Sequence, residues 1–287
     1  MLIPTVDPAT IGFDVPFVEY LEIAAAAGFR AVEFSIEHAR SFVQAHSARD
    51  LAALTRRLNI ELAQFTCGTG VPSNVSVSAG EFEQSVRRWQ DNCAFAATLG
   101  CRRASVLVNS AKGNGYEEDG LTLTAGELHD RLRLLCDHAS AHGITVAVEF
   151  VDAEMIALAG EIVGGAGRDN LGLLLDTYGL HKVSDPLAYV AALPQGTIVW
   201  LHLADTVVER SQPPGEYVKP LRVLPGQGNL PLGAIVEALR RQHGYRGYAS
   251  VEVYGSTIMA HQPFGRRADL AAASLFEGAL RSWFVSA

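Results

Sequence analysis

The sequence has little of several features that mark large classes of protein. Its four cysteines, Cys67, Cys93, Cys101 and Cys136, show no C-x-x-C spacing and are too few for a disulfide scaffold, so we expect reduced thiols. No stretch approaches the roughly 18 uninterrupted apolar residues of a membrane span. The first residues, Met1 to Asp7, lack the basic and apolar regions of a signal peptide. We therefore expect a cytoplasmic protein with no membrane partner.

Positive charge is also scarce. Lys and Arg number 23 against 31 Asp and Glu, which gives a formal net charge of -8. This balance offers no general attraction for polyanions, so we expect no nucleic-acid partner. A dinucleotide-binding glycine fingerprint is missing after the first apolar run, where Pro4-Thr-Val-Asp7 stands instead. Its absence argues against an open doubly wound sheet.

Apolar runs and helix-like segments alternate along the whole chain, and hydrophobic residues make up 48% of the composition. The predicted strands are residues 2–6, 31–36, 60–65, 104–109, 145–150, 171–176, 197–203 and 249–253. The predicted helices are residues 15–28, 48–58, 81–99, 124–142, 153–163, 186–193, 231–242 and 268–284. Because no proline-rich linker or break in composition divides them, we predict one (β/α)8 TIM barrel over residues 1–287.

Four consecutive predicted strands end in a side chain that can bind a metal: Glu149, Asp176, His202 and Glu252. Any one of them alone would be read as a helix cap, a solvated loop residue or a hydrogen-bonded histidine at the core edge. Buried carboxylates without partners are costly, however, so four at neighbouring strand ends favour a shared divalent ion. Three carboxylates and one imidazole suit Mn²⁺ first, and then Mg²⁺ or Co²⁺, better than a structural zinc.

The same four residues carry a family resemblance. Their order, with His202-Leu-Ala-Asp205 and Arg222-Val-Leu-Pro-Gly-Gln-Gly228, resembles the xylose-isomerase-like barrel superfamily of sugar isomerases and epimerases. The resemblance implies that all four bind the metal and that Glu149 and Glu252 are also the catalytic acid/base pair. It places Asp205 and Arg222 on the substrate side.

One departure weakens an assignment as an epimerase. Many epimerase-like members have a substrate-binding histidine three residues after the aspartate of strand six, where this chain has Gly179. The nearest histidine, His181, is a displaced candidate for substrate binding.

Three other residues are weaker candidates. Asn109, at the end of strand four, can contact a substrate hydroxyl or form a turn. Glu154 can touch substrate, although a place in the first turn of a helix is the simpler interpretation. Glu33 lies in the middle of strand two and fits either the barrel mouth or an ion pair with an interior cation.

The sequence therefore predicts an enzyme that uses one divalent ion on a small sugar or a polyol-derived ketone. Proton transfer by glutamate through a metal-stabilised enediolate would give isomerisation or epimerisation. The alternative is a dehydratase of the inosose or dehydroshikimate type. An endonuclease IV-like phosphodiesterase is a remote alternative, because it needs more histidines at strand ends and a basic surface. A noncatalytic barrel and a homo-oligomer stay open.

Overall fold

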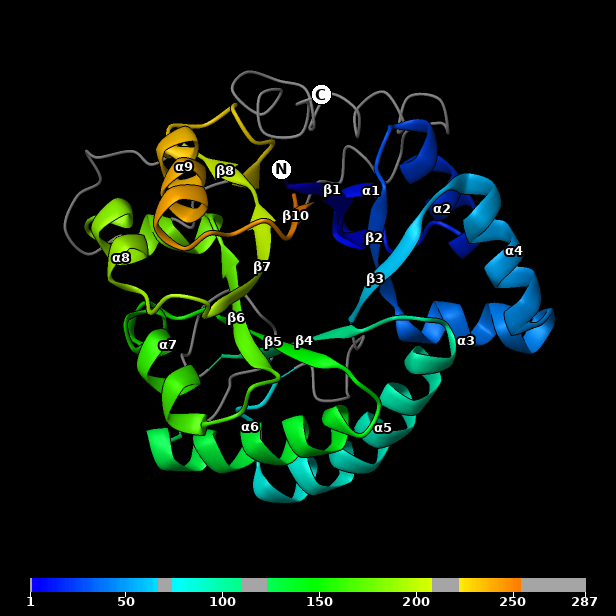
Figure 1. Cartoon of the computed structure of the whole chain (residues 1–287), viewed down its shortest axis with the longest axis horizontal. Coiled ribbons are helices and arrows are strands. Elements are labelled where there is room, and N and C mark those ends of the chain that lie inside the picture. The colour runs from blue at the N-terminus through cyan, green and yellow to red at the C-terminus, as the bar shows by residue number, and fades with distance from the viewer. Residues whose placement is uncertain (1, 67–73, 110–122, 208–221, 254–287) are drawn as a thin grey trace.

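The computed structural model describes residues 2–66, 74–109, 123–207 and 222–253. Within these residues, parallel strands close into a barrel in the order β1-β10-β7-β6-β5-β4-β3-β2, with helices around it (Figure 1). Pairing of β1 with both β10 and β2 completes the circle. The predicted (β/α)8 architecture is confirmed. The predicted last helix, residues 268–284, lies outside the described residues, so a single domain over residues 1–287 stays a prediction.

Each barrel strand matches one predicted apolar run. The strands are β1 (Ile3–Val6), β2 (Ala31–Ser35), β3 (Glu61–Thr66), β4 (Arg103–Val108), β5 (Thr145–Phe150), β6 (Leu171–Asp176), β7 (Ile198–Leu203) and β10 (Tyr248–Val251). Parallel strands that are covered by helices are buried on both faces, which explains their nearly continuous apolar composition.

Helices of the outer layer also follow the predicted pattern, with three additions. The helices are α1 (Pro8–Ile11), α2 (Phe17–Ala26), α3 (Ile36–Ala45), α4 (Ala48–Leu58), α5 (Ala79–Thr98), α6 (Ala125–Ser140), α7 (Ala153–Ala166), α8 (Pro186–Ala192) and α9 (Leu232–Gln242), with the 3-10 helix η1 (Tyr178–Lys182). The sequence did not predict α1, α3 or η1. Capping boxes start α5 and α6, where Ser78 pairs with Glu81 and Thr124 with Glu127.

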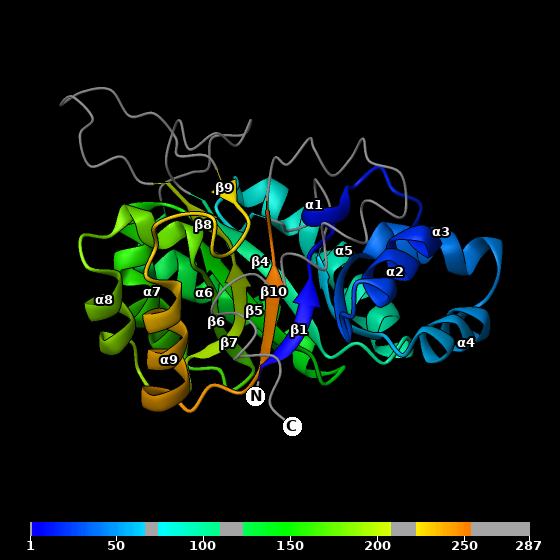
Figure 2. The ribbon, with the colours of Figure 1, turned by 90° about the horizontal axis from the view of Figure 1, so that it is seen from above.

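The carboxyl ends of the strands meet at one mouth of the barrel. Figure 2 shows β1 and β10 pointing toward this end, where the ribbon of β8 (Asp205–Thr206) and β9 (Arg222–Val223) also lies. The two short strands pair antiparallel, with Asp205 opposite Val223 and Thr206 opposite Arg222. The ribbon therefore brings Arg222 to the mouth, where active sites of this fold lie.

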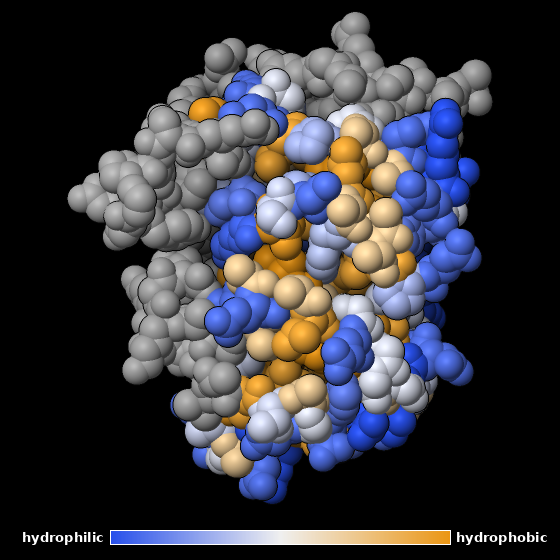
Figure 3. Space-filling model, turned by 90° about the vertical axis from the view of Figure 1, so that its left-hand side faces the viewer, coloured by the Kyte–Doolittle hydropathy of each residue, from blue (hydrophilic) through white to orange (hydrophobic). Residues whose placement is uncertain are grey.

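The cysteines, the hydropathy of the helices and the protein surface can be compared with the sequence-based expectations. Cys93, Cys101 and Cys136 are buried free thiols, as predicted, and Cys67 lies outside the described residues. No helix in the described ranges has the length and hydropathy that a membrane span needs. Figure 3 shows the side that carries α7 and α8, where apolar atoms reach the surface among polar ones. A homo-oligomer stays a prediction.

Candidate metal centre

Three of the four predicted ligands come together at the mouth. Glu149 and His202 are each the last residue but one of their strands, β5 and β7, and Glu252 directly follows β10. One ligand atom from each of these residues lies within 4.8 Å of the other two. The strands hold this arrangement, because Ser250 of β10 pairs with His202, and the Glu252 amide donates to the Leu203 carbonyl at 3.1 Å.

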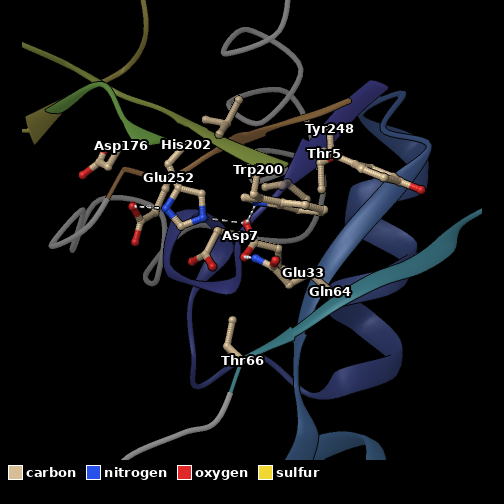
Figure 4. A network of polar contacts seen from close by, with 12 residues as sticks. Thr5, Asp7, Glu33, Gln64, Thr66, Asp176, Trp200, His202, Tyr248 and Glu252 are labelled. Atoms are coloured by element: carbon tan, nitrogen blue, oxygen red, sulfur yellow. Dashed lines mark hydrogen bonds and ion pairs between the residues drawn. The ribbon is translucent and has the colours of Figure 1, made fainter. Parts of the chain in front are cut away.

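His202 lies between two carboxylates (Figure 4). Its Nε2 is 2.9 Å from Glu33 Oε1, and its Nδ1 is 2.9 Å from Glu252 Oε2. The contact at Nδ1 is short but lacks hydrogen-bond geometry, since this buried atom has no hydrogen-bond partner among the described residues. A ring nitrogen and a carboxylate oxygen thus face the same small region, and both are atoms that can bind one ion once the nitrogen is free of its proton.

Asp176, the fourth predicted ligand, is held by Arg222. The Arg222 Nη2 donates to Asp176 Oδ2 at 2.8 Å, and Nη1 donates to Glu252 Oε2 at 2.5 Å. The other Asp176 oxygen accepts the Tyr178 amide at 2.9 Å. Because the guanidinium bridges two predicted ligands, it supplies positive charge at the place where the sequence predicted a cation. The predicted contact of Arg222 with substrate stays a prediction.

The carboxylates of the mouth repel one another. Burial raises the pKa of Glu149 to about 8, and the Glu252 carboxylate adds to the rise. Burial also raises the pKa of Asp176, although Arg222 offsets part of the effect. The pKa of Glu252 is lowered, because Arg222 and His202 outweigh the effect of its burial.

The imidazole responds in the opposite sense to burial. Burial lowers the pKa of His202, but Glu33 and Glu252 raise it by more, so that it lies well above its ordinary value. The two carboxylates therefore favour the protonated form of His202 when no ion is bound.

Two buried acids extend the cluster beyond the predicted ligands. Asp7, at the end of β1, and Glu33, in β2, each place an oxygen within 4.8 Å of a His202 nitrogen and of each other. Asp7 Oδ1 also accepts the Ala9 amide at 2.7 Å. Burial raises the pKa of Asp7, and Glu33 raises it further. The sequence analysis left Glu33 either at the mouth or paired with an interior cation. It missed Asp7, whose position after a short apolar run resembles an ordinary helix cap.

Asp205 holds the loop that follows β9. Its Oδ2 accepts the Gly226 and Gly228 amides at 3.1 and 3.0 Å, and its Oδ1 accepts the Leu230 amide at 3.1 Å. Gly228 is required there, since a Cβ would lie 2.3 Å from Asp205 Oδ1 and 2.4 Å from the Thr206 carbonyl oxygen. These contacts fix the approach of Arg222 to the mouth. A contact between Asp205 and substrate stays a prediction.

The other predicted substrate contacts lie around the same end of the barrel. The His181 ring packs on Tyr178 at 4.7 Å between centroids, and the Arg222 guanidinium lies 4.3 Å from the centroid of the same Tyr178 ring. Asn109 is buried directly after β4, and Glu154 is exposed in the first turn of α7. Substrate contacts of His181, Asn109 and Glu154 stay predictions.

The chemistry of the site fits a divalent ion. Oxygen atoms of Glu149 and Glu252 and a ring nitrogen of His202 offer three possible ligand atoms within 4.8 Å of one another. Asp176 is joined to this group through Arg222. Burial raises the pKa values of Glu149 and Asp176, and the Glu252 carboxylate adds to both, so a cation bound here would stabilise their ionised forms.

A family model described as xylose isomerase-like TIM barrel matches residues 21–275. The chain belongs to this family. The inosose isomerase of Bacillus velezensis is 25% identical over 240 residues, which cover 82% of each chain. The inosose isomerase of Halalkalibacterium halodurans is 32% identical over 125 residues, so the match spans 43% of that protein and 42% of this chain.

Two further comparisons bear on the chemistry and the fold. A 3-dehydroshikimate dehydratase of Pseudomonas aeruginosa is 26% identical over 256 residues, which cover 88% of this chain and 38% of that protein. The crystal structure of the IolI protein with a binding zinc atom has a TM-score of 0.79 and 20% identity, and covers 99% of this chain and 100% of that one. Its likeness shows the same fold.

Proposed function

We propose that this protein is a divalent-metal-dependent isomerase or epimerase that acts on a small keto-sugar or polyol-derived ketone. The observation that carries the proposal is the convergence of Glu149, His202 and Glu252, whose ligand atoms lie within 4.8 Å of one another at the barrel mouth. The similarity to the inosose isomerase of Bacillus velezensis over 82% of the chain favours a cyclic polyol-derived ketone as substrate.

The ion would be held by Glu149, Asp176, His202 and Glu252. Asp176 Oδ2 and Glu252 Oε2 accept from Arg222, but each oxygen has a second lone pair. Three carboxylates favour Mn²⁺, Mg²⁺ or Co²⁺. The zinc of the IolI structure adds Zn²⁺ to these candidates.

Proton transfer would belong to the two glutamates. A divalent ion held there would supply Lewis-acid polarisation of a substrate carbonyl, which would make the proton on the neighbouring carbon easier to remove. One glutamate takes that proton, and a proton returns to the same carbon in an epimerisation or to the adjoining carbon in an isomerisation. Arg222, which donates to Asp176 and Glu252, would orient a substrate oxygen.

A dehydratase is the second candidate. The 3-dehydroshikimate dehydratase relative matches 88% of this chain. The same abstraction of a proton beside a carbonyl, followed by loss of a β-hydroxyl as water, gives an unsaturated ketone. The two reactions share their first step and differ only in the fate of the intermediate.

The test uses chelator-stripped protein reloaded with Mn²⁺ in deuterated water. Inososes and keto-sugars are added, and the products are followed by NMR. A new isomer or epimer that carries deuterium beside the carbonyl is the expected result. An unsaturated product assigns the dehydratase reaction instead, and absence of both metal uptake and deuterium exchange overturns the proposal.

A further inference from the structure

Glu33 carries a carboxylate inside the barrel and is not one of the four proposed metal ligands. Its side chain is fully buried, at 0% exposure. Among the described residues, Gln64 Nε2 donates to it at 2.7 Å and Trp200 Nε1 at 3.1 Å, and His202 Nε2 lies 2.9 Å from its Oε1. A buried carboxylate costs free energy that an apolar side chain of the same size would not, so packing alone does not explain it.

The bond to His202 decides which imidazole nitrogen carries the proton. Both Glu33 oxygens already accept N–H groups, from Gln64 and Trp200, so the carboxylate faces His202 as an acceptor and Nε2 is the nitrogen that donates. In the neutral imidazole, Nδ1 is then the atom with the free lone pair. That atom has no hydrogen-bond partner among the described residues and faces Glu252 Oε2 at 2.9 Å.

We propose that Glu33 is a positioning residue that keeps His202 in its Nε2–H form and aims Nδ1 at the metal centre. The inference rests on the proposed metal site. A carboxylate behind a metal-binding histidine raises the basicity of the ligand and fixes the orientation of its ring.

The surroundings of Glu33 hold its oxygens in place. Figure 4 shows Trp200 and Gln64 on either side of the carboxylate, with His202 beyond it. The Trp200 ring stacks on Tyr248 at 4.8 Å with an interplanar angle of 17°, and Arg103 lies 4.5 Å from the Tyr248 centroid. Gln64 is the register partner of Glu33 in the neighbouring strand. The donors thus belong to strands and to a packed aromatic stack.

Glu33→Gln is an informative variant because it removes charge and preserves shape. Trp200 and His202 both donate to Oε1, while Gln64 donates to Oε2. A glutamine can keep its carbonyl oxygen at the first position and place its NH₂ toward Gln64. Gln64 Oε1 has no partner among the described residues, so a turn of that amide would supply the acceptor. The new amide can also rotate and donate to Nε2, which would allow the wrong His202 tautomer.

The experiment measures binding of Zn²⁺, a diamagnetic probe, by chelator competition in the wild type and in Glu33→Gln. Affinity should fall roughly 10–100-fold, as is typical when the partner of a metal-binding histidine is lost. Melting temperature and circular dichroism should stay near the wild-type values. Tyr248→Phe is the matched control. It removes the hydroxyl that donates to Glu61 at 2.7 Å, keeps the ring on Trp200, and should leave Zn²⁺ affinity unchanged.

A spectroscopic measurement on the wild type does not depend on how a variant folds. Long-range ¹H–¹⁵N spectra of Zn²⁺-loaded protein labelled in histidine should show His202 protonated at Nε2 and coordinated through Nδ1. Coordination through Nε2, or unchanged Zn²⁺ affinity in Glu33→Gln while His202→Ala loses it, overturns the positioning role and leaves the metal centre intact. If the wild type binds no Zn²⁺, Mn²⁺ or Co²⁺, the proposed function fails, and this inference fails with it.

Discussion

The interior of the barrel has two layers that differ in character although the same strands supply both. The lower layer, called here the floor, is the apolar cluster of Ala31, Ala63, Ala147, Leu174, Trp200 and Tyr248. Two residues further along β2, β5, β6 and β7 come Glu33, Glu149, Asp176 and His202, which with Glu252 form the mouth. Side chains two apart in a strand point to the same face, so each of these four strands adds one residue to each layer.

The two layers differ in whether their side chains need a hydrogen-bond donor or a cation as a partner. Floor side chains can be buried without hydrogen bonds, whereas each carboxylate of the mouth needs a donor or a cation. The described residues place Asp7, Glu33, Glu149, Asp176 and Glu252 around His202 and Arg222. Burial and neighbouring carboxylates raise the pKa of Asp7 and Glu149. The apolar floor fixes positions, and the mouth is left with a deficit of positive charge that a divalent ion would fill.

The largest expected effect is a loss of turnover when a mouth carboxylate proposed to transfer a proton is replaced. Glu149→Gln and Glu252→Gln keep an amide oxygen that can coordinate the ion, but neither side chain can accept a proton. Turnover of the Mn²⁺-loaded protein should fall roughly 10²–10⁴-fold, measured as the initial rate at saturating Mn²⁺. Exchange of substrate hydrogen with solvent deuterium should fall with it.

Asp176→Asn is the control for that pair, because the proposal makes Asp176 a ligand only. Its defect should follow metal occupancy and recover in part as the Mn²⁺ concentration rises. Normal turnover in Glu149→Gln or Glu252→Gln would make that glutamate a ligand without a proton-transfer role.

Loss of the imidazole should remove the metal. His202→Ala takes away the nitrogen ligand and leaves Glu149 and Glu252 facing each other without it. Metal content after dialysis, measured by mass spectrometry, should be far lower than in the wild type. The loss of metal affinity should exceed the roughly 10–100-fold loss that is typical when the hydrogen-bond partner of a metal-binding histidine is removed. Full metal occupancy in His202→Ala would exclude this residue from the centre.

A floor substitution should act on stability and spare the metal. Leu174 is 1% exposed and lies two residues before Asp176 in β6. Leu174→Ala should lower the free energy of unfolding by about 2–5 kcal/mol, measured by urea denaturation. Metal affinity of the folded protein should stay close to wild type. A large loss of metal affinity without a loss of stability would contradict the division between floor and mouth.

Sequence patterns could predict the strands and the convergence of three candidate ligands because both depend on local composition. Apolar runs of the right length give strands, and residues at the ends of parallel strands must meet at one mouth. The helix α3 was missed because it starts directly after β2, with Ser35 as its cap and no turn between them.

Contacts between residues far apart in the sequence could not be predicted from such patterns. Glu33 and His202 are 169 residues apart, and their bond depends on the size and closure of the barrel. The bridge from Arg222 to Asp176 depends on the β8–β9 ribbon and on four amides gathered by Asp205. No local spacing encodes either contact.

The smallest expected effect is a change in the stability of the metal-free protein with pH. Titratable side chains of the mouth cause it. The folded pKa of Glu149, about 8, lies above its ordinary value, so the folded state holds this proton more tightly than the unfolded chain does. The resulting stability is complete below the ordinary pKa and is lost as pH rises toward about 8. His202, whose pKa is also raised, contributes in the same direction. Glu252, with a lowered pKa, is ionised in both states near neutral pH and adds no slope there.

The melting temperature of chelator-treated protein should therefore fall between about pH 6 and about pH 9, and the fall should be smaller in Glu149→Gln. Leu174→Ala is the floor control, since an apolar truncation lowers the melting temperature without changing its slope against pH. A divalent ion competes with the proton on Glu149, so the stabilisation by saturating Mn²⁺ should grow as pH rises through this range. A metal-free melting temperature that rises with pH would mean that the mouth carboxylates already have enough positive charge without an ion.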